Sequence, residues 1–319
     1  MNILRPRSFD EYIGQENIKK LLKISVEAAK SRNEMLDHIL LSGPPGLGKT
    51  TIASILAYEM GKNFKFAIAS ALQKPIDLVG LLTSIDKEGS VLFIDEIHRL
   101  PKNLEEILYV SMEDYIVDIS VSKGIGAQSV RLNLPPFTLI CATTKPGSLS
   151  SPLIDRFGIH GYFEFYQEEE LSSIIKRSAE FLELEIEEEA SIFLAKRSRF
   201  TPRVANKLLR RVRDYVQVNK IKSIDILAAA ESLKIINIDD LGLNDLDRKY
   251  LHALKDIFKG GPAGIDNISQ FLGESPETIE DLCEPYLLKI DFVQRTPRGR
   301  VLTENAINYL DNSFCEKSI

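Results

Sequence analysis

The sequence has no tryptophan, only three cysteines and four histidines in 319 residues, and no apolar run long enough to cross a bilayer. Cys141, Cys283 and Cys315 lie far apart, which fits reduced thiols and argues against a disulfide framework or a metal-binding cluster. The N-terminal segment becomes charged at Arg5 and has no signal-like apolar core. We therefore expect a cytoplasmic protein with no zinc site and no membrane association.

The sequence also lacks an excess of positive charge, since its net charge is −6 and its isoelectric point is near 5.5. Any binding to nucleic acid must therefore come from a local basic patch and not from the surface as a whole. The apolar fraction of 44% and the charged fraction of 27% are ordinary for a globular protein. The length is sufficient for two or three domains, each with its own core.

Residues 43–50 have the sequence Gly-Pro-Pro-Gly-Leu-Gly-Lys-Thr, between an apolar run at 39–41 and a helical pattern that begins at Thr51. The order of strand, glycine loop and helix distinguishes a phosphate-binding loop from a chance match. The glycines let backbone N–H groups point at phosphate oxygens, and the helix adds its positive N-terminal end. Lys49 would then reach the β- and γ-phosphates, and the Thr50 hydroxyl would ligate Mg²⁺. A glycine turn that binds nothing would not need these two residues.

A second stretch, Ser90 to Glu96, has four apolar residues followed by two carboxylates. It predicts a buried parallel strand that presents Asp95 and Glu96 at its carboxyl end, where open α/β sheets bind their ligands. Asp95 suits the role of holding Mg²⁺, and Glu96 suits the base that orients the attacking water. Such a strand end is by itself usually a solvated cap. Beside a phosphate loop it makes ATP hydrolysis the leading interpretation.

Hydrophobic periodicity predicts the remaining elements of an α/β domain followed by helices. Further strands are expected at 64–69, 137–141 and 162–165, and helices at 18–29, from 51 to about 61, and at 101–115. Residues 116–134 predict a β-hairpin whose tip carries Ile125, which is either a plain surface residue or a docking point for a partner. From residue 168 onward the pattern is helical only, with helices expected at 168–183, 187–198, 202–219 and 223–234.

The last part of the chain has the pattern of a winged helix, a common reader of duplex DNA. Helices are expected at 241–258, 265–272 and from 276 to about 290, followed by strands at 292–296 and 300–302. Arg295, Arg298 and Arg300 make this wing basic, which fits contact with phosphates. A wing that contacts protein is the alternative.

These motifs, in this order along nearly the whole chain, closely resemble those of the RuvB family, the AAA+ motors of Holliday junction branch migration. The stretches that carry the resemblance are 4–6, 12–15, 43–51, 92–100, 112–115, 134–139, 155–158, 201–206 and 294–300. The resemblance implies an α/β fold with an AAA+ P-loop domain containing a parallel sheet, a small helical lid domain and a C-terminal winged-helix domain. The expected boundaries are 1–167, 168–238 and 239–319.

The resemblance also implies which residues bind the nucleotide. The residues expected around the adenine and the nucleotide edge are Leu4, Arg5, Glu113, Asp114, Tyr115 and Tyr166. Those expected to hold the phosphates and Mg²⁺ are Gly46, Gly48, Lys49, Thr50 and Thr51. ATP and Mg²⁺ are therefore the expected cofactors.

Three further roles in hydrolysis follow from the same resemblance. Arg156 resembles the arginine finger that is given to the nucleotide of the neighbouring subunit. Arg203 resembles the sensor arginine that reads the γ-phosphate from the lid domain, and Thr143 or Thr144 would be the first sensor. A finger supplied by a neighbour implies a ring of subunits, and the family resemblance implies a homohexamer.

On the DNA side, the resemblance implies that Arg295 and Arg300 contact duplex DNA at four-way junctions. The hairpin around Ile125 resembles the one that docks the junction-binding partner RuvA. Two features depart from the family's pattern: Pro276 stands where relatives often have a basic residue, and the tip residues 123–128 differ in detail.

Two other functions are compatible with the same motifs. A clamp-loader-like ATPase would use the nucleotide site to open a protein ring and would leave four-way junctions alone. A DNA-binding regulator switched by ATP would use the winged helix for sequence-specific readout and would hydrolyse slowly. Binding that is sensitive to salt and indifferent to sequence would count against the regulator.

Overall fold

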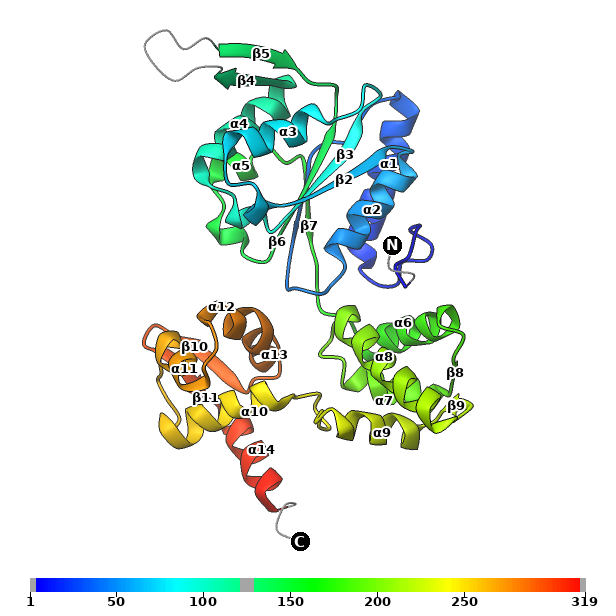
Figure 1. The fold of residues 1–319 in the computed structure, drawn as a ribbon, viewed down its shortest axis with the longest axis vertical. Coiled ribbons are helices and arrows are strands. Elements are labelled where there is room, and N and C mark those ends of the chain that lie inside the picture. The colour runs from blue at the N-terminus through cyan, green and yellow to red at the C-terminus, as the bar shows by residue number, and fades with distance from the viewer. Residues whose placement is uncertain (1–3, 121–128, 316–319) are drawn as a thin grey trace. The chain divides into compact units, whose positions relative to one another are not determined.

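The computed structural model describes residues 4–120 and 129–315, and its contacts divide the chain into two compact units, 1–170 and 171–319. The first unit contains a five-stranded parallel sheet with helices on both faces (Figure 1). The second unit is mostly helical and ends in a small two-stranded sheet and a last helix. Within the described ranges, no helix combines the length and apolarity that a bilayer crossing requires.

The sheet of the first unit has the strand order β2-β3-β6-β1-β7, and every neighbouring pair is parallel. Its strands are β1 (Ile39–Ser42), β2 (Asn63–Ile68), β3 (Ser90–Asp95), β6 (Thr138–Thr143) and β7 (Ile159–Tyr162). The inner strands β3 and β6 are almost completely buried, which explains their unbroken apolar sequences. The register, with Ile94 opposite Cys141, brings the carboxyl ends of β3 and β6 side by side.

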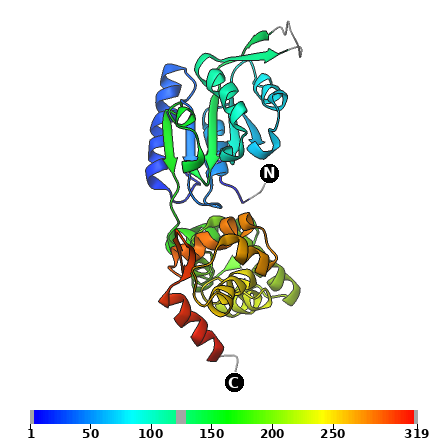
Figure 2. The same cartoon turned by 90° about the vertical axis from the view of Figure 1, so that its left-hand side faces the viewer.

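Two layers of helices cover this sheet (Figure 2). The first layer consists of α1 (Glu16–Arg32) and α2 (Lys49–Glu59), and the second of α3 (Pro75–Thr83), α4 (Lys102–Asp114) and α5 (Ser151–Ile154). Alternate strand residues face opposite layers, so Leu40, Leu92 and Leu139 join the core formed with α3, α4 and α5. On the other face the approach is so close that a Cβ on Gly161 would lie 2.0 Å from Ile18 Cδ1.

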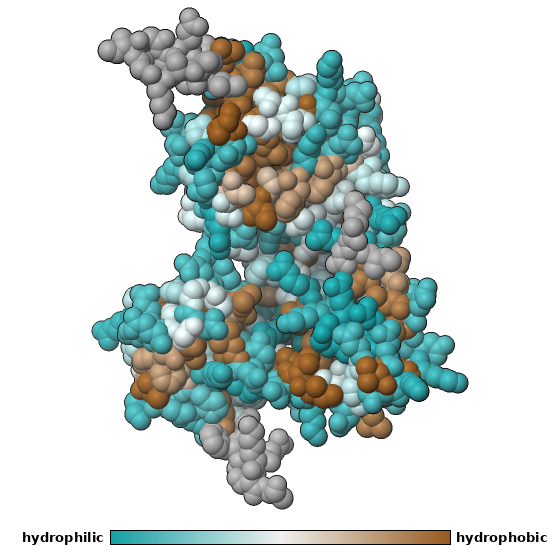
Figure 3. All heavy atoms as spheres, viewed as in Figure 1, coloured by the Kyte–Doolittle hydropathy of each residue, from teal (hydrophilic) through white to brown (hydrophobic). Residues whose placement is uncertain are grey.

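One edge of the sheet carries exposed apolar side chains. Figure 3 shows apolar atoms gathered on the visible face of the first unit, over β2 and α3. Phe66 and Ile68 of β2 and Ile76 of α3 are large apolar residues exposed on these elements. Edge strands are usually more polar than this, because an exposed edge can pair with another chain.

The predicted hairpin is present beyond the end of α4. Strands β4 (Ile116–Ser120) and β5 (Ser129–Asn133) pair antiparallel, and the Arg131 guanidinium donates two hydrogen bonds to the Asp118 carboxylate across the pair. The predicted docking residue, Ile125, lies outside the described residues.

For the first unit, one predicted strand is misplaced and one helix was missed. The last strand is β7, at 159–162 and not at 162–165, because the chain leaves the sheet once the Phe163 N–H has bonded to the Ser42 carbonyl. As an edge strand β7 alternates buried and exposed residues, so it lacks the apolar run used to predict strands. Helix α3 was not predicted at all, although Pro75 at its first turn and Asp77 in its capping box are ordinary helix-start signals.

The second unit begins with the helical part of the chain, which contains α6 (Glu168–Phe181), α7 (Glu188–Lys196), α8 (Pro202–Asn219) and α9 (Ile226–Ile235). The prediction of helices alone is corrected by two short strands, β8 (Glu185–Ile186) and β9 (Ser223–Ile224), which pair in parallel. Helix α9 also begins three residues later than predicted, because Asp225 is its N-cap and accepts a hydrogen bond from the Ala228 N–H.

The winged helix follows. Its elements are α10 (Asp245–His252), which continues as a π-helical turn at 253–257, α11 (Ile265–Leu272), α12 (Pro276–Thr278), a π-helical turn at 279–283, α13 (Glu284–Lys289), β10 (Val293–Thr296), β11 (Gly299–Leu302) and α14 (Glu304–Cys315). The helix predicted from 241 begins at Asp245, because Asn244 and Asp247 form a capping box. Helix α14 was not predicted. The two wing strands were predicted and are present.

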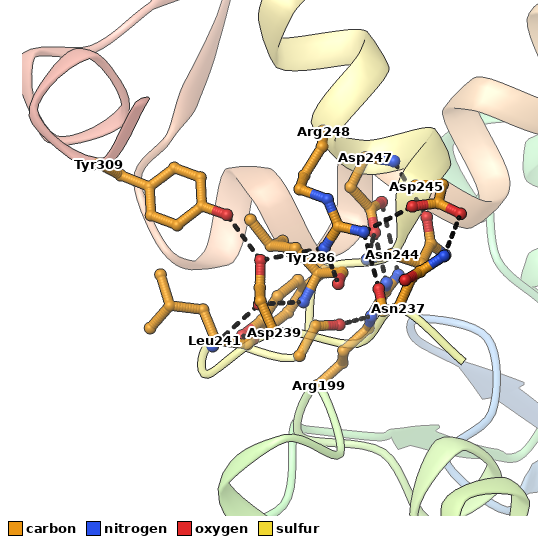
Figure 4. Close-up of polar contacts among 12 residues, drawn as sticks. Arg199, Asn237, Asp239, Leu241, Asn244, Asp245, Asp247, Arg248, Tyr286 and Tyr309 are labelled. Atoms are coloured by element: carbon orange, nitrogen blue, oxygen red, sulfur yellow. Dashed lines mark hydrogen bonds and ion pairs between the residues drawn. The ribbon is translucent and has the colours of Figure 1, made fainter. Parts of the chain in front are cut away.

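Polar contacts bind the segment between α7 and α8 to the winged helix (Figure 4). Arg199 donates from its Nε to the Gly242 carbonyl at 2.8 Å and forms an ion pair with the fully buried Asp247 of α10. Burial raises the pKa of Asp247, and the charge of Arg199 limits that rise. Arg248 adds bonds to the Asn237 carbonyl and the Asp239 carboxylate. Because a buried charge that lost its partner would be costly, these contacts hold the two helical parts of the second unit together.

Candidate functional site

The phosphate loop has the backbone that its glycines predict. Gly43, Gly46 and Gly48 all have positive φ angles, at 137°, 85° and 102°, a region that L-residues avoid. Helix α2 begins directly after Gly48, so its free N–H groups point into the loop. The Lys49 ammonium is almost fully buried and donates to the Gly43 and Pro44 carbonyls at 2.8 Å each. The loop is therefore formed in advance around a cation and a helix N-terminus, the combination that binds phosphate.

Two buried tyrosines brace the loop from behind. The Tyr12 hydroxyl donates to the Leu47 carbonyl at 3.2 Å, and the Tyr166 hydroxyl donates to Tyr12 Oη at 3.0 Å. Burial raises the pKa of Tyr166 to about 12, so both phenols remain hydrogen-bond donors at neutral pH. A Cβ on Gly48 would lie 2.6 Å from Tyr12 Oη, so glycine is required there on steric as well as conformational grounds.

Residues Leu4 and Arg5, predicted to line the adenine pocket, differ in their exposure. Leu4 is buried in the first unit, whereas Arg5 is exposed. Tyr166 is brought to the phosphate loop, as its contacts with Tyr12 and Leu47 show.

Asp95 lies beside the phosphate loop at the carboxyl end of β3. The Thr50 hydroxyl lies 3.4 Å from Asp95 Oδ2 and donates to it, so two hard oxygen donors from different elements meet at one point. Oxygen donors of this kind suit Mg²⁺, which takes one or two protein ligands and completes its shell with nucleotide phosphates and water. Among the described residues no group of three or more His, Cys, Asp or Glu side chains forms a self-sufficient metal site. The donor set fits a metal that arrives with a nucleotide.

Glu96 follows Asp95 and has a left-handed backbone, with φ at 55°. Its carboxylate lies 3.4 Å from His98 Nε2 and 3.4 Å from Arg99 Nε. His98 Nδ1 lies 3.0 Å from the hydroxyl of Thr143, a fully buried residue at the end of β6. The sequence did not single out His98, because its contact with Thr143 depends on β3 and β6 being neighbours in the sheet. Of the two threonines considered as a first sensor, Thr143 is the one in this network.

Glu113 and Arg156 lie near the amino-terminal ends of the strands, whereas the phosphate loop lies at their carboxyl ends. They form an ion pair at 3.1 Å, and the Arg156 guanidinium also donates to the Pro152 carbonyl. The His38 ring, just before β1, bonds the Met112 carbonyl at 3.0 Å, which fixes the end of α4 at the amino-terminal edge of the sheet. The structure does not bring these side chains, or the adjoining Asp114 and Tyr115, to the phosphate loop of the same chain.

In the second unit, Arg203 occupies the first turn of α8 and is exposed. Thr201 is the N-cap, and its hydroxyl accepts a hydrogen bond from the Val204 N–H. Within the described ranges, no carboxylate forms an ion pair with Arg203, so its guanidinium is available to an anion.

In the wing, Arg295 and Arg300 converge on one carboxylate. Glu284 of α13 is fully buried and accepts from Arg295 Nε at 2.7 Å and from Arg300 Nε at 2.9 Å. The side chain of Arg300 is 14% exposed and has a second ion pair with Glu280, whereas Arg295 is 47% exposed. Arg298, in the turn between the strands, is exposed and has no ion pair with any described residue. Of the three wing arginines, Arg298 and Arg295 present the most accessible charge.

This arrangement predicts an acid-sensitive winged helix. Burial alone would raise the pKa of Glu284, but the hydrogen bonds and charges of Arg300 and Arg295 outweigh it and lower that pKa below its usual value. A lowered carboxyl pKa stabilises the fold above the unfolded-state pKa, and this stabilisation is lost as pH falls through the folded-state pKa. We expect Glu284→Gln to destabilise the protein by about 2–3 kcal/mol at pH 7 and by less near pH 4.

The measurement is denaturant unfolding at several pH values. Glu274→Gln, an exposed carboxylate between α11 and α12, is the matched control and should leave the pH profile unchanged. An equal loss of stability at pH 7 and pH 4 for Glu284→Gln would contradict the electrostatic explanation.

Comparisons with known proteins match the chain over nearly all of its length. Residues 4–163 match the sequence profile described as Holliday junction DNA helicase RuvB P-loop domain, 166–239 the RuvB AAA lid domain, and 240–311 the RuvB C-terminal winged helix domain. The Holliday junction branch migration complex subunit RuvB of Clostridium kluyveri is 51% identical over 310 residues, covering 97% of this chain and 88% of the relative. The subunit of the same name from Fusobacterium nucleatum is 52% identical over 306 residues, covering 96% and 92%.

Solved structures give the same result. The Thermotoga maritima RuvB Holliday junction branch migration motor is 46% identical, has a TM-score of 0.88, and is matched over 97% of this chain and 99% of that one. A mutant form of Thermotoga maritima RuvB has a TM-score of 0.90 at the same identity and coverage. The predicted fold class, with a P-loop domain, a lid domain and a winged helix, is confirmed.

Proposed function

The chain belongs to the RuvB family, and we propose that it is an ATP-driven DNA motor for Holliday junction branch migration in recombination and repair. It is an ATP hydrolase, and its substrate is duplex DNA at a four-way junction. The observation that carries this conclusion is the match to RuvB over all three domains, together with a phosphate loop, a magnesium-type donor pair and a carboxylate at one sheet edge. Domain boundaries at 1–167, 168–238 and 239–319 and a cytoplasmic location are parts of this proposal.

The nucleotide roles proposed for the first unit rest on the family resemblance, and the geometry of the phosphate loop and of Asp95 supports them. Lys49 and the loop N–H groups, from Gly46 to Thr51, would hold the phosphates, while Thr50 and Asp95 would hold Mg²⁺. When bound, Mg²⁺ would neutralise charge on the phosphates during transfer. Glu96 holds the attacking water. Leu4, Arg5 and Tyr166 are proposed for the nucleoside end.

We propose that the active form is a hexameric ring in which one subunit completes the site of the next. Arg156 and Glu113 lie at the amino-terminal edge of the sheet, whereas the phosphate loop lies at the carboxyl edge. The intervening strand β1 alone has four residues, roughly 13 Å at the rise of a β-strand. An arginine side chain cannot span that distance and the loop beyond it, so the proposed finger role of Arg156 requires a neighbouring subunit. The segment from Glu113 to Tyr115 would meet the same neighbour's nucleotide.

Force would pass from nucleotide to DNA through the second unit. We propose that Arg203 contacts the γ-phosphate. Loss of this phosphate would remove the contact and let the lid helices rotate. The ion pair between Arg199 and Asp247, with the bonds of Arg248, supports a rotation that carries the winged helix with the lid. The wing, through Arg295 and Arg300, then grips and moves the duplex. The β4–β5 hairpin is proposed to dock a RuvA-like junction-binding partner.

A single experiment tests the proposed function. Purified protein is given ATP, Mg²⁺ and a synthetic four-way junction, with and without a RuvA-type partner, and strand exchange is measured. We expect exchange that depends on ATP, and we expect Glu96→Gln to bind ATP and stop exchange. ATP hydrolysis with no exchange on any junction, or DNA binding that depends on sequence and not on ATP, would contradict the proposal and favour a clamp-loader-like or regulatory function.

A further inference from the structure

His98 occupies a position between the two elements that would detect and hydrolyse the γ-phosphate. It lies in a short 3-10 turn, Ile97–Arg99, that follows β3, and its side chain is 8% exposed. One ring nitrogen, Nδ1, lies 3.0 Å from Thr143 Oγ1, and the other, Nε2, lies 3.4 Å from a carboxylate oxygen of Glu96. The imidazole therefore bridges a buried hydroxyl and the proposed catalytic carboxylate.

The hydrogen-bond directions in this bridge are consistent along its whole length. The Lys145 N–H donates to Thr143 Oγ1 at 3.0 Å, which leaves the threonine hydroxyl proton free to donate elsewhere. When the Thr143 hydroxyl donates a hydrogen bond to His98 Nδ1, that nitrogen is the acceptor and the ring proton is on Nε2. There it faces the Glu96 carboxylate. In this arrangement of protons, Thr143 donates to His98 and His98 donates to Glu96.

The positions of the two ends are fixed by the sheet. Glu96 follows the last residue of β3 and Thr143 ends β6, and these strands are hydrogen-bonded neighbours. Glu96 also has the left-handed backbone that non-glycine residues seldom adopt, which sets the direction of its side chain. Arg99 contacts the same carboxylate oxygen, but His98 is the group that connects Glu96 to Thr143.

We propose that His98 is a positioning residue through which the Thr143 hydroxyl controls the orientation of the Glu96 carboxylate. By donating to His98 Nδ1, the Thr143 hydroxyl keeps the imidazole proton on Nε2, and that proton holds the Glu96 carboxylate in the orientation that receives the attacking water. Without the imidazole or the hydroxyl, the carboxylate loses this support. This inference rests on the proposed ATPase function and assigns a further residue to it.

The proposal predicts a change in turnover with no change in nucleotide affinity. We expect His98→Ala to lower the turnover number by roughly tenfold, the size of effect typical of groups coupled in one network. The dissociation constant for a fluorescent ATP analogue should stay within about twofold, because the bridge joins His98 to Thr143 and Glu96, and neither is among the loop residues proposed to hold the phosphates. His98→Gln should recover part of the turnover, since an amide can accept from Thr143 and donate to Glu96.

A double-mutant cycle separates this role from simple packing. Thr143→Val removes the hydroxyl and keeps the shape, and its effect on turnover is measured with and without His98→Leu, which has no donor or acceptor and keeps most of the ring's volume. We expect the double variant to be no slower than the slower single variant, because both changes cut the same connection. His252→Ala, on α10, is the control histidine and should leave turnover unchanged.

Losses that multiply in the double variant, or a dissociation constant that rises together with the loss of turnover, would overturn the proposal. The cycle uses leucine and valine, which fill most of the original volume, so it remains decisive even when alanine at position 98 prevents folding. A parent protein that fails to hydrolyse ATP would instead reject the proposed function. These two failures are distinguishable because the parent is measured in the same assay.

Discussion

Lys49→Ala is expected to abolish ATP hydrolysis and, with it, junction movement. The Lys49 ammonium is buried and bonded to the Gly43 and Pro44 carbonyls, so it lies inside the loop that receives the phosphates. Losing a positioned cation that stabilises transition-state charge costs on the order of 10² to 10³ in rate. Because the same cation also binds the ground state, affinity for ATP should fall as well. Phosphate release at saturating ATP and equilibrium binding together measure both effects.

The control for this experiment is Lys20→Ala, an exposed lysine on α1, which should hydrolyse ATP as the parent does. A second variant, Lys49→Met, keeps most of the side-chain volume, so that a loss of activity cannot be attributed to a cavity in the loop. Hydrolysis by either Lys49 variant at the parent rate would mean that the loop does not bind the reacting phosphates.

The parts of the site that the sequence predicted are the parts that are contiguous in the chain. The phosphate loop and the Asp95-Glu96 strand end are short patterns in which neighbouring residues act together, so their chemistry is visible without the fold. The buried strands β3 and β6 were predicted for the same reason, since their apolar runs are local. Glycines at 43, 46 and 48 adopt the positive φ angles that the motif requires.

The parts that were not predicted depend on contacts between distant residues. His98 and Thr143 are 45 residues apart and meet because β3 and β6 pair. The attachment of Arg295 and Arg300 to Glu284 joins the wing to α13, and a count of basic residues in the wing cannot reveal it. Strand β7 was misplaced because an edge strand needs no apolar run. In each case the missing information was which elements are neighbours.

Arg156→Ala should leave ATP binding intact and reduce turnover by roughly 10³ to 10⁵, the range over which an arginine finger acts. The side chain is partly exposed, and it pairs with Glu113, which is 66% exposed. Breaking so exposed an ion pair should cost at most about 1 kcal/mol, so the variant should fold. The guanidinium of Arg156 also lies 4.9 Å from the centroid of the Tyr109 ring. Because Arg156→Lys keeps the charge but not the planar guanidinium, this variant should recover little turnover.

Mixing two inactive variants tests whether this finger acts between subunits. A Lys49→Ala subunit lacks a working phosphate loop but still offers Arg156, whereas an Arg156→Ala subunit has the loop and lacks the finger. In a mixed ring some sites contain the loop of one and the finger of the other, so the mixture should hydrolyse ATP faster than either variant alone. A finger that acted within its own chain would leave every subunit in the mixture incomplete, and no activity would return. Because Arg156 and the phosphate loop lie at opposite edges of the same sheet, we expect activity to return.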